Sequence, residues 1–196
     1  MGNMGIWIKL TSAGLVAAFV LVGAGCSKKL SSETESTSLA SAAQSVDPLS
    51  FSVLDAKTRE YTFGLNEFMR THGSEVKQHS THGETLGGVP ANCSYTVSLD
   101  GKYEVLQMEK DLGGGMQVDE YFNLGDALFI TRSTMHDDGK FDPVDKYYIT
   151  EGMLYKLDST AKTVTQIVNI NDPSAEEAKA NIDIYFSFEE IREIYA

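Results

Sequence analysis

Large apolar side chains recur at helical spacing in residues 52–72. The spacings of about three, four and seven are those of one helix face, so they predict an amphipathic helix from Ser52 to His72. Ser52 with Asp55 resembles a helix-start pair, and Gly73 is a typical residue at a helix end. The members of the predicted apolar stripe are Leu54, Tyr61, Leu65, Phe68 and Met69.

Beyond Val89 the pattern changes to short apolar runs separated by turn residues, which indicates strands. The first two runs flank Asp100-Gly101, a strong two-residue hairpin signal. Gly113 to Gly115, which lack a following lysine and helix, and Gly125-Asp126 indicate further turns. The predicted strands are CSYTVSL, KYEVLQME, MQVDEYFNL, ALFITRSTM, KYYIT, MLYKLD and TVTQIVNI.

The C-terminal residues return to a helical pattern. Ser174 with Glu177 is a capping-box pattern, and Ser187 with Glu190 predicts the start of a last helix, FEEIREIY. The run NIDIYF between them fits either a helix or an edge strand.

The order of these elements predicts an α+β fold. We expect an antiparallel β-meander of about six to seven strands packed with an N-terminal helix and a C-terminal helix or helices. Residues 51–196 are predicted to form this single domain. The serine-rich residues 26–50 carry too few large apolar side chains to order themselves, so they predict a flexible tether.

Residues 13–25, AGLVAAFVLVGAG, form an uncharged apolar run preceded by Lys9. A membrane-spanning helix needs roughly 20 apolar residues, so this run is short for a permanent anchor unless the preceding GIWI is recruited. Its length and its charged flank are typical of a secretory signal peptide, which we assign to residues 1–25.

Cys26 follows three small residues, Gly23, Ala24 and Gly25, and precedes Lys28 and Lys29. This stretch resembles the lipobox of bacterial lipoproteins. The resemblance covers only about the first 29 residues and implies that Cys26 receives a diacylglyceryl group, with cleavage just before it. Two acyl chains hold a protein stably on a bilayer, and the lysines would lie at the headgroups.

The resemblance implies a cell-membrane protein, lipid-anchored through Cys26 on the extracytoplasmic face. Ser27 resembles the residue that permits sorting to the outer membrane where a bacterium has two membranes. Once Cys26 is modified, no second cysteine is left for a disulfide with Cys93, which we interpret as a buried strand residue rather than a reactive thiol.

The formal net charge is −12, and removal of residues 1–25, whose only charged side chain is Lys9, changes it to −13. Such a surface repels nucleic acid, so we expect no nucleic-acid partner. It also disfavours adsorption to anionic membrane, which leaves the lipid as the means of attachment.

Two clusters are weak candidates for metal binding. His72, His79 and His82 could supply nitrogen ligands to zinc, although their spacing is not HExxH and a surface connection is the preferred interpretation. Asp137, Asp138 and Asp142 could supply oxygen ligands to calcium. That segment lacks the EF-hand pattern, and we interpret it as a long hairpin turn. We therefore predict neither a metal site nor a cofactor.

No motif for a nucleophile, a phosphate loop or a dinucleotide is present in the sequence, so an enzyme is not the preferred hypothesis. Tyrosines are frequent on the predicted strands, where cross-strand core packing is the preferred interpretation. The alternative is a concave aromatic surface that binds a peptide, glycan or lipid. The residues are Tyr95, Tyr103, Tyr121, Tyr147, Tyr148 and Tyr155.

We therefore expect a non-enzymatic binding or interaction module of the cell envelope, whose partner is an envelope protein, peptide, glycan or lipid. One alternative is a carrier or sensor of a hydrophobic ligand in a curved sheet. This rests on an architecture, a helix against a bent meander, that resembles lipoprotein carrier and sensor folds of the envelope, and architecture does not fix function. The other alternative is an envelope enzyme whose site has no recognisable motif.

Overall fold

The computed structural model describes residues 47–84 and 90–195, which lie in one compact unit, Gln44–Ala196. Its helical elements are α1 (Phe51–His72), the 3₁₀ turn η1 (Gly73–Glu75), α2 (Ala175–Ile182) and α3 (Phe188–Tyr195). Its strands are β1 (Val76–Glu84), β2 (Pro90–Ser98), β3 (Glu104–Asp111), β4 (Gly115–Asn123), β5 (Ala127–His136), β6 (Asp145–Thr150), β7 (Met153–Asp158) and β8 (Thr163–Asn169).

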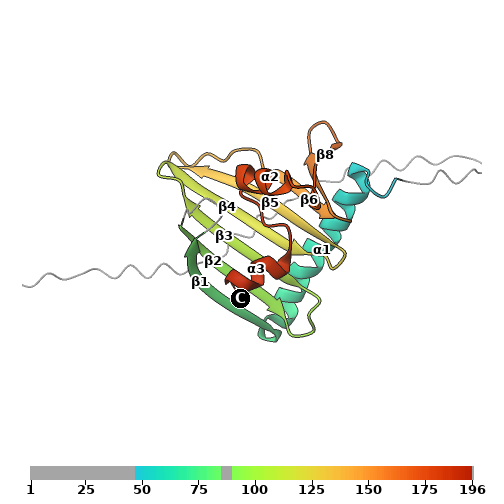
Figure 1. Cartoon of the computed structure of the whole chain (residues 1–196). Coiled ribbons are helices and arrows are strands. Elements are labelled where there is room, and N and C mark those ends of the chain that lie inside the picture. The colour runs from blue at the N-terminus through green and yellow to red at the C-terminus, as the bar shows by residue number, and fades with distance from the viewer. Residues whose placement is uncertain (1–46, 85–89, 196) are drawn as a thin grey trace, which may run out of the picture. The chain divides into compact units, whose positions relative to one another are not determined.

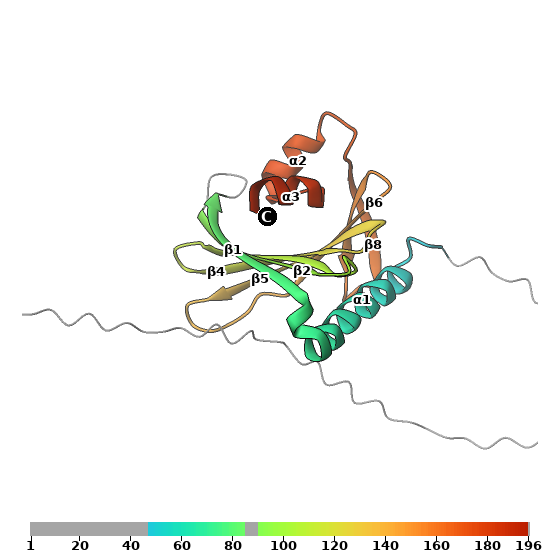
Figure 2. The same cartoon turned by 90° about the horizontal axis from the view of Figure 1, so that it is seen from below.

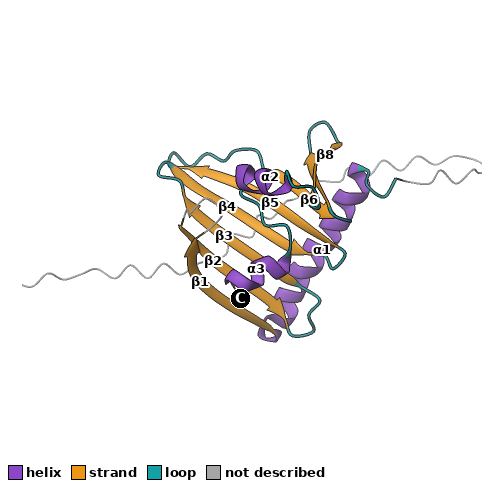
Figure 3. Cartoon of the chain, in the orientation of Figure 1, coloured by secondary structure: helices purple, strands orange, loops and turns teal. Residues whose placement is uncertain are grey.

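The strands form a single eight-stranded sheet in which each strand pairs with its neighbours in the sequence, in the order β1 to β8 (Figure 3). Every pairing is antiparallel. The predicted antiparallel meander between an N-terminal helix and C-terminal helices is therefore confirmed. The sheet has eight strands rather than six or seven.

The additional strand is β1, in the segment around His79 and His82 whose sequence predicts a surface connection. It pairs along its whole length with β2, from Val76 opposite Ser98 to Glu84 opposite Pro90. The strand is polar because it lies at the edge of the sheet, where charged and polar side chains protect the open hydrogen-bonding groups from unwanted pairing. Its sequence therefore lacks the apolar alternation that reveals the other strands.

The helices lie on opposite faces of the sheet. Figure 2 shows α1 under one end of the sheet and both α2 and α3 on the other side. The same view shows that the sheet bends, so that β6 and β8 rise on the side of α2 and α3. In Figure 1 α1 crosses behind the strands and α3 lies in front of β2 and β3.

Each helical layer packs on its own hydrophobic core. The core under α1 contains Phe51, Leu54, Phe122, Ala127, Phe129, Tyr148, Tyr155 and Leu157. The larger core under α2 and α3 includes Leu106, Met108, Tyr121, Ile130, Leu154, Ile184, Tyr185 and Ile191. Because successive strand residues point to opposite faces, one strand contributes to both cores, as Tyr121 and Phe122 of β4 do.

The predicted first helix is confirmed, with its start one residue earlier, at Phe51. Leu54 is buried, and Tyr61 and Leu65 pack against the same core. The helix passes directly into η1 at Gly73, so a 3₁₀ turn ends it rather than a left-handed glycine. Neither α1 nor any other helix among the described residues is both long and apolar enough to cross a membrane.

The segment NIDIYF is neither a continuous helix nor an edge strand. It begins in the last turn of α2, which stops because Asp183 adopts a left-handed conformation (φ 51°). The next two residues, Ile184 and Tyr185, are buried in the core against the sheet. The burial of these two side chains, rather than a helix or a strand, therefore sets the conformation of this segment.

All six tyrosines of the predicted strand region are buried, which confirms their interpretation as core residues. Tyr95, Tyr121 and Tyr147 belong to the core under α2 and α3. Tyr148 and Tyr155 belong to the core under α1, and Tyr103 forms edge and tilted ring contacts with Tyr61 and Phe68 of α1. These rings therefore do not form an exposed aromatic surface.

Candidate functional site

The most prominent polar cluster of the described residues begins on β3. Every second residue of this strand, from Glu104 through Leu106 and Met108 to Lys110, is buried on the face under α2 and α3. The row thus has a carboxylate at one end and an ammonium group at the other. Glu104 is 5% exposed and Lys110 is 2% exposed, so each charge needs a partner inside the protein.

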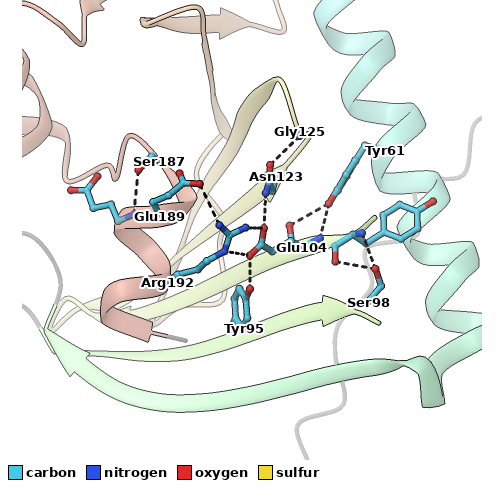
Figure 4. Close-up of polar contacts among 11 residues, drawn as sticks. Tyr61, Tyr95, Ser98, Glu104, Asn123, Gly125, Ser187, Glu189 and Arg192 are labelled. Atoms are coloured by element: carbon cyan, nitrogen blue, oxygen red, sulfur yellow. Dashed lines mark hydrogen bonds and ion pairs between the residues drawn. The ribbon is translucent and has the colours of Figure 1, made fainter. Parts of the chain in front are cut away.

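The side chain of Glu104 is held by donors from three other elements (Figure 4). Arg192 of α3 forms a bidentate ion pair with it, with Nε 2.6 Å from Oε1 and Nη2 2.5 Å from Oε2. The amide of Asn123, at the end of β4, donates to Oε2 at 2.5 Å, and the hydroxyl of Tyr95 on β2 donates to Oε1. This fork geometry is the strongest form of carboxylate recognition by a side chain.

The backbone of Glu104 is bound from the opposite face of the sheet. Its N–H donates to the hydroxyl of Tyr61 on α1 at 2.9 Å, and the same hydroxyl donates to its carbonyl oxygen at 3.2 Å. The Tyr61 ring packs edge-on against Tyr103 and Phe122. Glu104 therefore connects α1, the sheet and α3 at one residue, and we call this group of Tyr61, Tyr95, Glu104, Asn123 and Arg192 the Glu104 cluster.

The electrostatics of the Glu104 cluster favour an ionised carboxylate. Burial alone raises the pKa of Glu104, but the hydrogen bonds from Arg192, Tyr95 and Asn123 outweigh burial, so its pKa lies below the ordinary value. The ion pair with Glu104 raises the pKa of Arg192. Burial raises the pKa of Tyr61 to about 12, so its hydroxyl stays protonated and can donate at neutral pH.

A second charged cluster lies at the other end of the β3 row. Asp119 of β4 is fully buried and receives a bidentate pair from Arg132 of β5, with Nε–Oδ1 at 2.7 Å and Nη2–Oδ2 at 2.9 Å. Lys110 lies 3.5 Å from Asp119 and forms an ion pair with Asp183, which follows α2. Two acids and two bases balance the charge, and we call these four residues the Asp119 cluster.

Arg132 also binds the backbone that ends α2. Its Nη1 donates to the carbonyl oxygen of Ile182 at 2.6 Å, and its Nη2 donates to that of Asp183 at 3.0 Å. These carbonyl groups lack partners within the helix because they lie at its C-terminus, where a cation is also favoured by the helix dipole. The Asp119 cluster therefore fixes the segment between α2 and α3 on the sheet.

The two clusters perform one physical task at the two ends of β3. Each pairs a buried carboxylate with a guanidinium group, and each joins the sheet to the C-terminal segment. In the Glu104 cluster the hydrogen bonds lower the pKa of Glu104 and so favour its ionised form. This arrangement suits the docking of α2 and α3, and a general acid or base would instead need a pKa close to the working pH.

The structure separates the three candidate histidines. His72 lies in the last turn of α1, where its ring stacks on Phe68 with centroids 5.2 Å apart. His79 lies on β1, with its ring centroid 6.4 Å from that of Tyr95, and His82 is opposite Asn92 in the register of β1 and β2. Among the residues that the structure describes, no group of three His, Cys, Asp or Glu could hold a metal ion.

The candidate aspartates lie in and beside the β5–β6 connection, which forms a turn as predicted. Asp138 forms an ion pair with Lys140, and Asp142 forms one with His136 at 3.1 Å. Asp137 lies in the turn itself. The backbone N–H of His136 donates to the carbonyl of Lys140, so these side chains lie at the turn end of the β5–β6 hairpin.

The structure describes Cys93 but not Cys26. Cys26 lies outside the described residues, as do the predicted signal peptide and almost all of the predicted tether. Cys93 is buried on β2 among the residues of the core under α2 and α3, which confirms its interpretation as a buried strand residue.

Two hollows on the surface of the described residues are open to solvent. One, of about 610 Å³, lies at the start of α1 and is lined by Phe51, Asp55, Arg59 and Lys162. The other, of about 270 Å³, lies where the β4–β5 and β6–β7 turns meet the start of α3, beside Asn123. Neither is an enclosed apolar chamber.

The Glu104 and Asp119 clusters were not predicted from the sequence. A signal for them exists, because Glu104, Lys110, Asp119 and Arg132 each stand in phase with apolar residues of their strands. A charge at a core position must find a buried partner. The sequence could therefore have marked these residues as paired, although it does not identify their partners.

In comparisons with known proteins, no family model, no curated protein and no solved structure matches this chain. The function proposed below therefore rests on the sequence and on the geometry of the sheet and its helices.

Proposed function

We propose that this chain is a bacterial lipoprotein, anchored by Cys26 on the extracytoplasmic face of a membrane, whose domain is a non-enzymatic interaction module of the cell envelope. The observation that carries the proposal is the stretch LVGAGCSKK, in which small residues and then Cys26 end an apolar run. A diacylated Cys26 would bind a bilayer stably, because two chains suffice where one does not. The polar residues that follow would give the domain reach above the membrane.

The arrangement of the domain supports a binding role on its outer surface. The face of the sheet under α2 and α3 is filled by large side chains, of which Tyr121, Ile130 and Ile184 are fully buried. A carrier of a hydrophobic ligand would need enclosed apolar space at this position. The buried charges are likewise used to dock helices, which leaves the surface of the molecule for recognition.

The anchoring is tested by fractionating cells that produce the full chain. We expect the wild-type protein in the detergent-soluble membrane fraction and the Cys26→Ser variant unprocessed. Globomycin, which blocks cleavage of lipoprotein precursors, should likewise cause the wild-type precursor to accumulate.

Cys93→Ala is the matched control, because it removes the other cysteine and leaves the processing stretch intact. Its maturation should equal that of the wild type. Recovery of mature wild-type protein in the aqueous fraction, or normal processing of Cys26→Ser, would contradict the proposal.

A further inference from the structure

The face of the sheet that carries α1 is only partly used by that helix (Figure 2). Directly opposite residues of antiparallel strands share a face, so the register divides this face into rows that run across the strands. The row of Phe122, Phe129 and Tyr148 lies in the core under α1. From this row, further rows follow on the same strands toward the β3–β4 turn.

The next row on this face is polar. Gln107, Glu120 and Thr131 are opposite one another on β3, β4 and β5, and all three are half-buried. The hydroxyl of Thr131 donates to Glu120 at 3.0 Å, and the amide of Gln107 donates to Glu109 of the following row at 3.0 Å. These contacts hold two carboxylates in place on a sheet surface that solvent reaches.

The last row is apolar at its centre. Met116 is opposite Met135, which forms a bridge with Phe141. Met135 is 40% exposed and Phe141 is 62% exposed. Val118 lies on the same face, one row closer to α1, and we call Met116, Val118, Met135 and Phe141 the distal patch. Exposed apolar side chains gathered within a polar rim are typical of protein interaction sites.

The rim of the distal patch is strongly acidic. Asp111 is opposite Met116, and Glu109 is opposite Val118. The turn beside Phe141 adds Asp137 and Asp138, and Asp138 is paired with Lys140. Asp142 follows Phe141, so it points to the other face, where it pairs with His136. The acidic residues of the rim are Glu109, Asp111, Glu120, Asp137 and Asp138.

We propose that the distal patch docks a basic amphipathic segment of a partner protein, with apolar side chains over Met135 and Phe141 and with lysines or arginines over the acidic rim. Charge complementarity selects this occupant. A second copy would bring an equally acidic rim against this one, and an anionic bilayer would also be repelled. Apolar contact at the centre with charges at the edge is the usual anatomy of an interface.

This inference rests on the proposed interaction role and is tested on the full lipidated protein in phosphatidylcholine nanodiscs. The probe is a fluorescent synthetic helix with leucine on one face and lysine on the other, and empty nanodiscs supply the background. We expect saturable binding that weakens as salt is added, since the rim charges are exposed. A leucine–glutamate helix of the same pattern should not bind above background.

Substitutions in the distal patch and on α1 test whether the probe helix binds at the patch. We expect Met135→Gln together with Phe141→Gln to weaken binding at least about tenfold, the effect of losing one good anchor. Phe63→Gln is the matched control, because Phe63 is also an exposed aromatic residue but lies on α1. Glu109→Gln with Asp111→Asn should weaken binding and flatten its dependence on salt.

Three results would overturn the inference. They are equal binding of the acidic helix, equal effects of the patch and Phe63 substitutions, and a dimer in sedimentation that the patch substitutions abolish. The last result would assign the patch to a second copy. Because anchoring is measured separately by fractionation, a failure of the docking inference can be distinguished from a failure of the proposed lipoprotein.

Discussion

Glu104 is the residue on which most of the domain's polar contacts converge. A buried carboxylate is costly to desolvate, and it is tolerated when hydrogen bonds and an opposite charge satisfy it. Here Arg192, Tyr95 and Asn123 satisfy the side chain, and Tyr61 binds the backbone from the other face. We therefore expect the domain to be sensitive to small changes at this position.

Replacing Glu104 by glutamine should lower the free energy of unfolding by about 1–3 kcal/mol, because a buried hydrogen-bonded charge is lost while Arg192 stays in place. Urea unfolding followed by circular dichroism measures the change. Glu189→Gln is the matched control, since Glu189 contacts the same guanidinium group at 3.3 Å but its side chain is 77% exposed. The control should change stability by less than about 0.5 kcal/mol. Equal effects of both substitutions would refute the assigned role.

The same carboxyl group predicts how stability depends on pH. Because the pKa of Glu104 is lower in the folded protein than its ordinary value of 4.5, its contribution is fully present above pH 4.5 and is lost as pH falls through the folded pKa. The difference in unfolding free energy between wild type and Glu104→Gln should therefore shrink in urea titrations below pH 4.5. A difference that grows on acidification would have the wrong sign for a paired carboxylate.

Two tyrosine hydroxyls on the α1 side should respond differently to removal. Tyr61→Phe deletes both contacts to the Glu104 backbone and should cost about 1 kcal/mol. Tyr148→Phe should be neutral or stabilising, because the buried Tyr148 hydroxyl has no hydrogen-bond partner among the described residues. Thermal unfolding of the two variants checks this contrast, and a larger loss in Tyr148→Phe than in Tyr61→Phe would contradict it.

At the scale of elements, the apolar pattern predicted α1, the seven strands β2 to β8 and their meander order. The Asp100-Gly101 signal lies in the observed β2–β3 turn, where Gly101 has a φ of 70°, although this connection spans residues 99–103 rather than two residues. The pattern failed at β1, whose edge position needs no apolar alternation, and at NIDIYF, whose conformation is set by burial of Ile184 and Tyr185. Local periodicity does not contain either kind of information.

The partners within the charged clusters could not be predicted for the same reason. Arg192 and Glu104 are 88 residues apart in the sequence. Their contact depends on α3 crossing β3 on one particular face of the sheet. The sequence shows that β3 has charges in phase with its core residues, and only the fold shows where α3 lies.

The two predicted capping boxes differ, and this gives an element-scale test. At α3 the Glu190 N–H donates to the Ser187 hydroxyl at 3.2 Å, and Glu190 Oε2 accepts from the Phe186 N–H at 3.1 Å. At α2 the Ser174 side chain makes no capping bond, so that prediction is wrong in its contacts. There the Asp172 carboxylate accepts from the Ser174 N–H at 2.8 Å. The backbone carbonyl of Asp172 accepts from the N–H of Ala175, the first residue of α2, at 2.9 Å.

Ser187→Ala should therefore cost about 1 kcal/mol, the usual value of a lost cap. Ser174→Ala should change stability by less than about 0.5 kcal/mol, since no cap is lost. Urea midpoints of the two variants give the comparison directly. A similar loss for both serines would show that the observed Ser187 contact does not stabilise α3.

At the scale of the whole molecule, the domain is a bent sheet with a helical layer on each face and a strongly acidic surface. The two charged clusters hold the C-terminal helices at both ends of β3, and α1 covers part of the other face. The distal patch lies on the remainder of that face. The proposed lipid at Cys26 would keep this surface in the envelope, within reach of partners there.

The mass of the mature amino terminus tests the central proposal most directly. Intact-protein mass spectrometry of the chain purified from membranes should give Cys26 as the first residue, with a diacylglyceryl thioether on its sulfur and residues 1–25 absent. An unmodified Cys26 thiol in a chain that still carries residues 1–25 would contradict the assignment of this protein as a lipoprotein.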